Sequence, residues 1–206
     1  MEKVIEVKNH RVVCSDLMLM NFDDLMQGKH ATLMYSDPPW GEGNLRYWQT
    51  LNKRMTGASV NEVNLVNFLK LIFKIADKYV SEIIWLEYGI GWRQLINDYC
   101  DRYGFIHLAR IDSFYKSGSK LLPLDIHMIS KKLIPVRAEY LRSFTGLTGY
   151  NTVINAIRPY AVPGEIIIDP CCGMGYTAQS AVDTGMIFYG CELNQKRLDK
   201  TIQRLQ

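Results

Sequence analysis

Four residues in the first quarter of the chain, Asp37-Pro38-Pro39-Trp40, combine groups that could act on an aromatic amine. Neither proline has a backbone N–H, so acceptors in this segment meet little competition from backbone donors. The Asp37 carboxylate and a nearby carbonyl oxygen could both accept hydrogen bonds from one exocyclic NH2 group and localise its lone pair. Trp40 offers a flat face for stacking. The alternative is a surface turn, since Asp-Pro is common in turns.

A second motif lies near the other end, where the apolar run 166–168 is followed by a glycine-rich segment, 169–177. A glycine turn between a strand and a helix lets a ligand approach the backbone closely. The next apolar run ends at Glu192, 17 positions after Gly175. A ribose-binding acid is expected about 20 residues after such glycines. This order of strand, glycine loop, helix, strand and acid predicts a site for an adenosine-bearing cofactor.

The glycine loop also limits the choice of cofactor. It lacks the lysine of a phosphate-cradling loop and the third glycine of a dinucleotide-binding loop. Asp169 at the strand end would repel a pyrophosphate and would suit a cationic ligand with an amino group. The methionine part of S-adenosylmethionine is such a ligand.

The two motifs together resemble those of the amino-methyltransferases that methylate exocyclic amines of DNA bases. The segment 37–40 is similar to that family's catalytic tetrapeptide, and 169–177 is similar to its cofactor loop, usually Asp-Pro-Phe-x-Gly-x-Gly-Thr. The tetrapeptide comes first, which resembles the circularly permuted class usually called beta. Val12-Val13-Cys14-Ser15-Asp16 resembles the family's strand that ends in Gly-Asp, and the similarity spans residues 12 to 205.

The resemblance implies a DNA adenine-N6 methyltransferase that takes its methyl group from S-adenosylmethionine. The target base would be flipped from a duplex or lie in single-stranded DNA. Asp37 and the Pro38 carbonyl would bind the amine, Pro39 would complete the motif and Trp40 would stack on the base. The residues assigned to the cofactor are Asp16, Asp169, Pro170, Cys171, Gly173, Gly175, Thr177 and Glu192.

Three positions depart from the family pattern. Thr148-Gly149 stands where the family usually has Lys-Pro at the head of a helix, so no role is assigned to a lysine. Cys171 replaces the phenylalanine of the loop, and Tyr176 interrupts the final glycine-threonine pair. Cofactor binding is still expected.

Basic residues gather in two segments, although the net charge of the 206 residues is only +3. The segment 43–61 holds three cations and no acid, and 116–142 is also basic. Cations interleaved with aromatics suit a nucleic acid, although charge runs are usually solvated surface. The residues assigned to nucleic-acid binding are Arg46, Tyr47, Trp48, Lys53, Arg54, Lys116 and Lys120.

Hydrophobic periodicity predicts strands alternating with helices, and therefore a doubly wound, mostly parallel α/β sheet. The resemblance implies that this sheet is of the Rossmann-like methyltransferase type. The expected strands are 11–15, 31–36, 82–87, 105–115, 124–131, 166–169 and 187–191. The expected helices are 20–26, 61–79, 90–102, 151–159, 176–184 and 194–205. The pair 105–115 and 124–131 is expected as an antiparallel hairpin at one edge. Asp16, Asp37, Asp169 and Glu192 would then share the edge where ligands bind in such sheets.

Length and composition predict one domain over 1–206. The resemblance implies that it is a methyltransferase domain, and no separate target-recognition domain is expected. Sequence specificity is therefore expected to be slight, to be built from short loops or to come from a specificity partner. A second copy of the chain is the other expected protein partner. No apolar run approaches the roughly 18 residues that span a bilayer, and the N-terminus is unlike a signal peptide. We expect a cytoplasmic protein with no metal site, since its five cysteines include no Cys-x-x-Cys pair.

Three alternatives stay open. Cytosine-N4 methylation is the first, although Ser more often leads the tetrapeptide of that type. Adenine in RNA is the second, because Asp-Pro-Pro-Trp also resembles the messenger-RNA adenine methyltransferases. The third is a catalytically silent nucleic-acid-binding subunit that keeps the fold as a scaffold.

Overall fold

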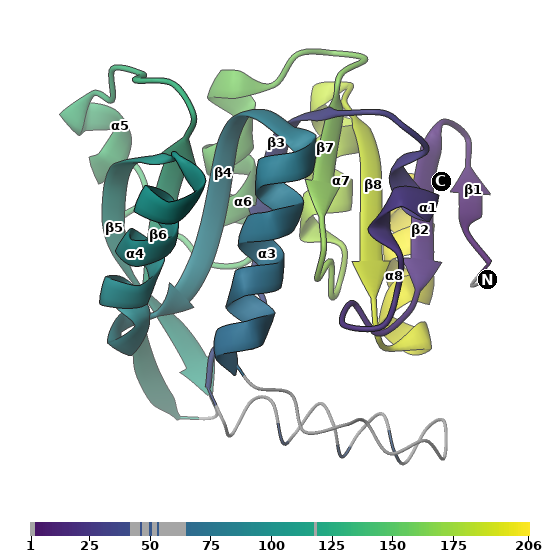
Figure 1. Cartoon of the computed structure of the whole chain (residues 1–206), viewed down its shortest axis with the longest axis horizontal. Coiled ribbons are helices and arrows are strands. Elements are labelled where there is room, and N and C mark those ends of the chain that lie inside the picture. Colours follow the sequence, from purple (N-terminus) through teal and green to yellow (C-terminus); the bar gives the residue numbers. More distant parts are fainter. Residues whose placement is uncertain (1–2, 42–45, 47–49, 51–52, 54–64, 118) are drawn as a thin grey trace.

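The computed structural model describes residues 3–41, 46, 50, 53, 65–117 and 119–206. Within them, eight strands form one sheet in the order β1-β2-β8-β7-β3-β4-β6-β5 (Figure 1). The strands are β1 (Ile5–Val7), β2 (His10–Cys14), β3 (Ala31–Ser36), β4 (Val80–Gly89), β5 (Ile106–Ser117), β6 (Lys120–Ser130), β7 (Ile166–Asp169) and β8 (Ile187–Glu192).

The middle of the sheet is parallel and both edges are antiparallel. β2, β8, β7, β3 and β4 pair in parallel. β6 runs antiparallel between β4 and β5, which confirms the expected edge hairpin. A second antiparallel pair, β1 with β2, lies at the other edge and was not foreseen, because β1 has only three residues.

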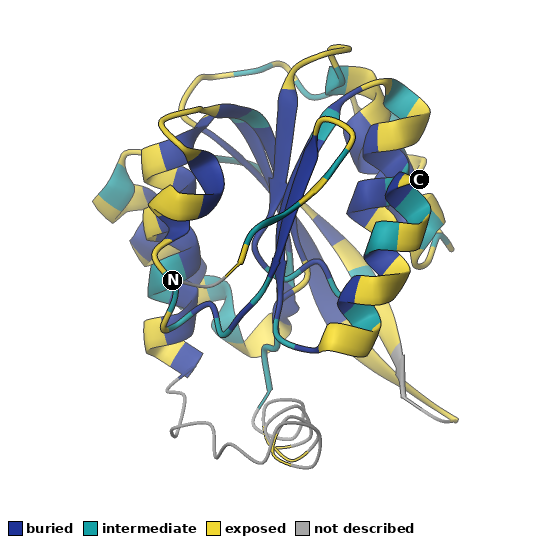
Figure 2. Cartoon of the chain, turned by 90° about the vertical axis from the view of Figure 1, so that its right-hand side faces the viewer, coloured by how far each residue is buried: buried dark blue, intermediate teal, exposed yellow. Residues whose placement is uncertain are grey.

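Helices cover both faces of the sheet. On one face lie α1 (Phe22–Met26), α3 (Leu65–Tyr79) and α4 (Arg93–Tyr103). On the other lie α5 (Ala138–Arg142), α6 (Tyr150–Ile157), α7 (Tyr176–Thr184) and α8 (Gln195–Leu205). Each face has its own hydrophobic core, and the strands between them are buried, as Figure 2 shows in edge-on view. This is the predicted doubly wound α/β class.

Local sequence signals explain where several elements begin and end. The β-branched residues Ile166, Ile167 and Ile168 form β7, which is buried on both faces. Gly104 ends α4 in the left-handed region, with φ 68°. Asn194 caps α8 by accepting a hydrogen bond from the Arg197 backbone N–H. The expected helix at 90–102 starts as a 3-10 turn, Ile90–Trp92, and becomes α-helical at Arg93.

Candidate functional site

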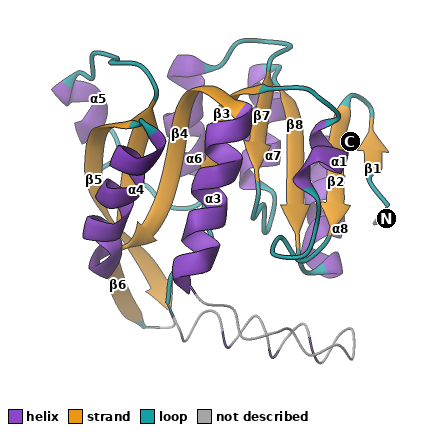
Figure 3. Ribbon diagram, in the orientation of Figure 1, coloured by secondary structure: helices purple, strands orange, loops and turns teal. Residues whose placement is uncertain are grey.

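The site lies where parallel strands end around the middle of the sheet. β3 and β7 are neighbours, yet the helices that follow them, α3 and α7, cover opposite faces. Such a change of side leaves a crevice at the carboxyl ends of the strands, where ligands bind in open α/β sheets. The strand directions in Figure 3 show β2, β7 and β8 ending at the same edge. Asp16, Asp37, Asp169 and Glu192 all lie at this edge, as predicted.

Strand register brings Asp37 beside a carboxylate that the sequence reasoning missed. β3 pairs with β4 through Tyr35–Trp85 and Ser36–Leu86, so the next position sets Asp37 beside Glu87. The Tyr35 hydroxyl, on the same face of β3, donates a hydrogen bond to Glu87 Oε1. The signal for Glu87 was present in the sequence, because it is the last residue of the expected strand 82–87.

Asp37 is an exposed side chain in an acidic neighbourhood. Partial removal of water by the surrounding protein, followed by the charges of Glu87 and Asp169, raises the pKa of Asp37, and Arg197 opposes the rise. Because the side chain still reaches solvent, water attenuates these effects. The result is a carboxylate with a raised proton affinity at the end of β3.

Trp40 lies at the outer edge of the same crevice. A Cβ on Gly89, the last residue of β4, would come within 2.6 Å of Trp40 Cε3, so glycine is required for the indole to lie there. The Trp92 indole N–H donates to the Trp40 carbonyl at 2.8 Å. The Trp40 and Tyr115 rings meet edge to face, with centroids 6.4 Å apart. The hairpin β5–β6 therefore reaches the candidate catalytic segment.

Asp169 is the most buried of these acids, with 3% of its surface exposed. Its Oδ1 accepts the Cys171 backbone N–H at 3.0 Å, and its Oδ2 accepts the Thr177 hydroxyl at 2.6 Å. Burial raises the pKa of Asp169 to about 7, although both hydrogen bonds act in the opposite direction. A carboxyl group with a pKa of about 7 therefore lies at the end of β7, where the glycine loop begins.

Glu192 ties the glycine loop to the start of α8. Its Oε2 accepts the Gly173 backbone N–H at 2.8 Å and its Oε1 accepts the Asn194 backbone N–H at 2.9 Å. Burial raises the pKa of Glu192, and the hydrogen bonds and the Arg197 charge lower it. Arg197 reaches over the loop, since its Nη1 lies 3.5 Å from a Cβ built on Gly173. The sequence reasoning missed this cation, which no family motif marks.

Three residues assigned to the cofactor shape the loop from below. Pro170, Gly175 and Thr177 are buried. The Thr177 hydroxyl donates a hydrogen bond to Asp169 Oδ2. A Cβ on Gly175 would lie 2.8 Å from Thr201 Cα, so this glycine allows α8 to approach the loop closely. Their expected contribution to ligand binding is thus through the position of Asp169 and the loop backbone, whereas Cys171 and Gly173 are half-buried at its surface.

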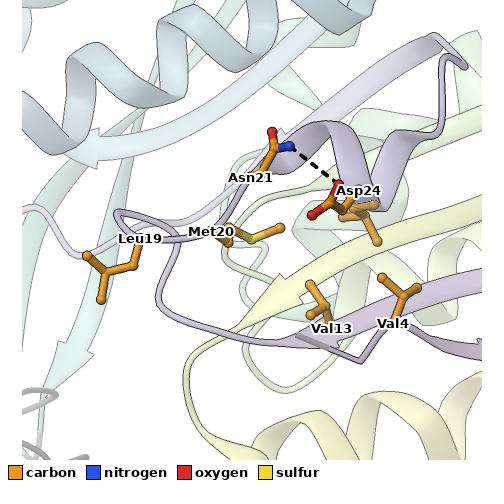
Figure 4. A pocket seen from close by; sticks show the side chains of 7 residues that line it. Val4, Val13, Leu19, Met20, Asn21 and Asp24 are labelled. Atoms are coloured by element: carbon orange, nitrogen blue, oxygen red, sulfur yellow. Dashed lines mark hydrogen bonds between the residues drawn. The ribbon is translucent and has the colours of Figure 1, made fainter. Parts of the chain in front are cut away.

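Asp16 follows β2 and turns the chain back toward α1. Its Oδ1 accepts the Met18 backbone N–H at 2.9 Å, and the carboxylate is half-buried. The segment that follows this turn takes part in lining a pocket of about 250 Å³ (Figure 4). It is lined by Val4, Val13, Leu19, Met20, Asn21, Asp24 and Leu25. None of the four carboxylates at the crevice is among its lining residues.

The position where the family usually has lysine carries no charge. Gly149 precedes α6 with φ +56°, and a Cβ there would lie 3.4 Å from the Tyr176 ring. Tyr176 itself starts α7 and lies against the Arg204 guanidinium, 5.1 Å from its ring centroid. Two of the three departures from the family pattern therefore meet at one place, where Tyr176 packs beside Gly149.

The expected nucleic-acid residues are only partly described. Arg46, Lys53 and Lys120 are exposed. Lys116 belongs to β5, near the hairpin end. Tyr47, Trp48 and Arg54 lie outside the described residues. The contact of Tyr115 with Trp40 places the hairpin that carries Lys116 and Lys120 next to the candidate catalytic segment.

No protein-family model and no curated protein matches the chain. Solved structures match its fold. M1.HpyAVI in complex with SAM aligns with TM-score 0.67 and 16% identity, over 95% of this chain and 98% of that chain. A second similar structure is TTHA0409 from Thermus thermophilus, named as a proposed DNA modification methylase and solved with S-adenosyl-L-methionine. It aligns with TM-score 0.65 and 17% identity, over 95% of this chain and 93% of that chain.

A third similar structure is the PvuII DNA methyltransferase, which is cytosine-N4-specific. It aligns with TM-score 0.65 and 12% identity, over 97% of this chain and 87% of that chain. Together these similarities establish the methyltransferase-type fold for this chain. Within the described residues, no helix is both long and apolar enough to cross a membrane.

Proposed function

We propose that this chain is an S-adenosylmethionine-dependent methyltransferase that acts on the N6 amine of adenine in DNA. The observation that carries the proposal is that the two motifs lie at the same edge of the sheet, after two neighbouring strands. Asp37-Pro38-Pro39-Trp40 follows β3, and the loop of Asp169 follows the neighbouring strand β7. The proposed acceptor for the amine and the proposed cofactor loop thus follow neighbouring strands, at the edge of the sheet where ligands bind in this class of fold.

The residues of the loop fit the proposed cofactor. Asp169 would face the ammonium group and Glu192 the ribose hydroxyls, and Asp16, which follows β2 next to β8, would contact the cofactor's adenine. When bound, S-adenosylmethionine would supply a methyl group on a cationic sulfur. M1.HpyAVI and TTHA0409, which share the fold, were both solved with this cofactor. The charge of the site and these two similarities support the same ligand.

The tetrapeptide would make the target amine reactive. Asp37 and the Pro38 carbonyl would accept the two amine hydrogens and draw the nitrogen toward tetrahedral geometry, which localises its lone pair. Trp40 would hold the base by stacking. Because the target amine must leave a duplex to reach the crevice, the base would be flipped or single-stranded.

Cytosine-N4 methylation in DNA is the second candidate. PvuII DNA methyltransferase, whose structure matches over 97% of this chain, is cytosine-N4-specific and supports it. The Asp-led tetrapeptide favours adenine. An RNA substrate and a catalytically silent binding subunit are the remaining alternatives. We expect a cytoplasmic enzyme whose specificity comes from its short loops, a second copy or a partner.

Transfer of a labelled methyl group tests this proposal. Purified protein would be incubated with methyl-tritiated S-adenosylmethionine and, in parallel, with duplex DNA, single-stranded DNA and RNA. The proposal predicts label in DNA. Label in RNA alone would select the RNA alternative. Cofactor binding without any transfer would select the silent subunit.

Cofactor affinity should depend on pH through Asp169. Its pKa of about 7 means that the cation-binding carboxylate form is lost as the pH falls from 8 to 6. Affinity for S-adenosylmethionine should therefore fall on acidification, by at most about tenfold per pH unit. Calorimetry at both pH values measures it. Thr177→Val, which removes a hydrogen bond that lowers this pKa, should move the midpoint to higher pH. Constant affinity between pH 6 and 8 would contradict this role of Asp169.

The basic residues Arg46 and Lys53 of the segment 43–61 should bind DNA phosphates. Arg46→Glu with Lys53→Glu should weaken DNA binding and lower the slope of log affinity against log salt by about 0.9 for each phosphate that the protein no longer neutralises. Cofactor affinity should not change. Fluorescence anisotropy from 50 to 200 mM salt, roughly the range over which such slopes are read, measures the slope. The control pair is Lys74→Glu with Lys200→Glu, two exposed lysines on α3 and α8. Equal slopes in the two pairs would show that Arg46 and Lys53 are ordinary solvated surface.

A further inference from the structure

Glu87 is a carboxylate in the crevice that the proposed chemistry does not use. It is half-buried near the end of β4, and the register of β3 with β4 sets it directly beside Asp37. Aligned residues on neighbouring parallel strands lie about 4.8 Å apart and point to the same face of the sheet. The two carboxylates therefore face the same side of the crevice.

Tyr35 fixes the position of Glu87. Tyr35 is fully buried in the core beneath α6 and α7, and its hydroxyl donates to Glu87 Oε1 across the two strands. A buried phenol whose hydroxyl donates its one hydrogen bond to a carboxylate holds that carboxylate in one orientation. Glu87 is thus held in place next to Asp37 by the core of the protein.

We propose that Glu87, anchored by Tyr35, is a positioning residue that makes Asp37 the acceptor of the proton that the target amine loses. This inference rests on the proposed function. In the step, the amine nitrogen forms a bond to the methyl carbon, the bond from that carbon to sulfur breaks, and sulfur keeps the electron pair. One amine hydrogen, already bonded to Asp37, passes as a proton to the Asp37 carboxylate and later to water.

The charges around Asp37 agree with this role. Three groups face it from neighbouring elements: Glu87 from β4, Asp169 from β7 and Arg197 from α8. Loss of water is the largest cause of the raised pKa of Asp37, the negative charge of Glu87 is the second and that of Asp169 the third. The positive charge of Arg197 lowers this pKa. Burial raises the pKa of Glu87, and the hydrogen bond from Tyr35 opposes part of that rise by stabilising the charged carboxylate. A charged Glu87 keeps Asp37 a better proton acceptor.

The pH profile of single-turnover methyl transfer tests the role of Glu87. Activity needs ionised Asp37, so the wild-type rate should fall on the acid side as Asp37 is protonated. Glu87→Gln keeps the shape and the Tyr35 bond but removes the charge. It should move the acid limb to lower pH by about one unit and lower the plateau rate about tenfold. Glu87→Asp, which keeps the charge, should restore most of the wild-type limb.

The matched control is Glu82→Gln on the same strand, whose carboxylate pairs with Lys132 at 2.7 Å away from the crevice. Glu82→Gln should change neither the pH at which the rate falls on acidification nor the plateau rate. If Glu87→Gln is active and its rate falls on acidification over the same pH range as that of the wild type, the inference is overturned. If the wild-type protein transfers no methyl group at any pH, the proposed function fails instead.

Discussion

Asp37→Ala should lower the rate of methyl transfer by about 10²–10³-fold, the usual loss when one preorganised group is removed from such a site. Asp37 lies at the end of β3, outside the glycine loop, and it accepts no hydrogen bond from that loop among the described contacts. Affinity for S-adenosylmethionine should therefore remain close to that of the wild type. Single-turnover transfer and calorimetry measure the two quantities separately.

Two further variants sharpen this prediction. Asp37→Asn keeps an oxygen acceptor but loses the charge, so its rate should lie between those of the wild type and Asp37→Ala. Asp98→Ala removes an exposed carboxylate on α4 and should have no effect. Turnover of Asp37→Ala within a few-fold of the wild type would remove Asp37 from the catalytic assignment.

Glu192→Ala should weaken binding of S-adenosylmethionine by about 1.5–3 kcal/mol, the range for lost hydrogen bonds to a charged group. Glu192 acts in two ways, because it would hold the ribose hydroxyls and it also accepts the backbone N–H groups of Gly173 and Asn194. Its loss should therefore loosen the loop as well as remove a ligand contact. Calorimetry measures the affinity.

The control for Glu192 is Glu165→Ala, an exposed acid just before β7. Thermal unfolding without cofactor reports how much of the effect comes from the loop alone. A Glu192→Ala protein with wild-type affinity would show that Glu192 has only the structural role of joining the glycine loop to α8.

The central elements of the fold could be predicted from local sequence. The apolar runs that form β3 and β7 end at Asp-Pro, and the observed bounds, Ala31–Ser36 and Ile166–Asp169, agree with those expected. Elements with weak local signals were missed. β1 has three residues and is held by its pairing with β2, and α5 has only five residues.

The site was predictable at the level of motifs, and less so at the level of individual contacts. The four acids at strand ends follow from their positions at or just after the ends of apolar runs that alternate with helices. The burial of Gly175 depends on how α8 packs against the loop, which no local pattern encodes. The contact between Tyr115 and Trp40 joins segments far apart in the chain and required the structure.

The most direct test of the central claim is the identity of the methylated base. DNA would be incubated with the wild-type protein and S-adenosylmethionine, digested to nucleosides and analysed by mass spectrometry, with Asp37→Ala in parallel. The proposed function predicts N6-methyladenine from the wild type and almost none from Asp37→Ala. N4-methylcytosine would replace the adenine assignment with the cytosine alternative. Unmodified nucleosides, or equal modification by both proteins, would contradict the claim that Asp37 serves an exocyclic amine of DNA.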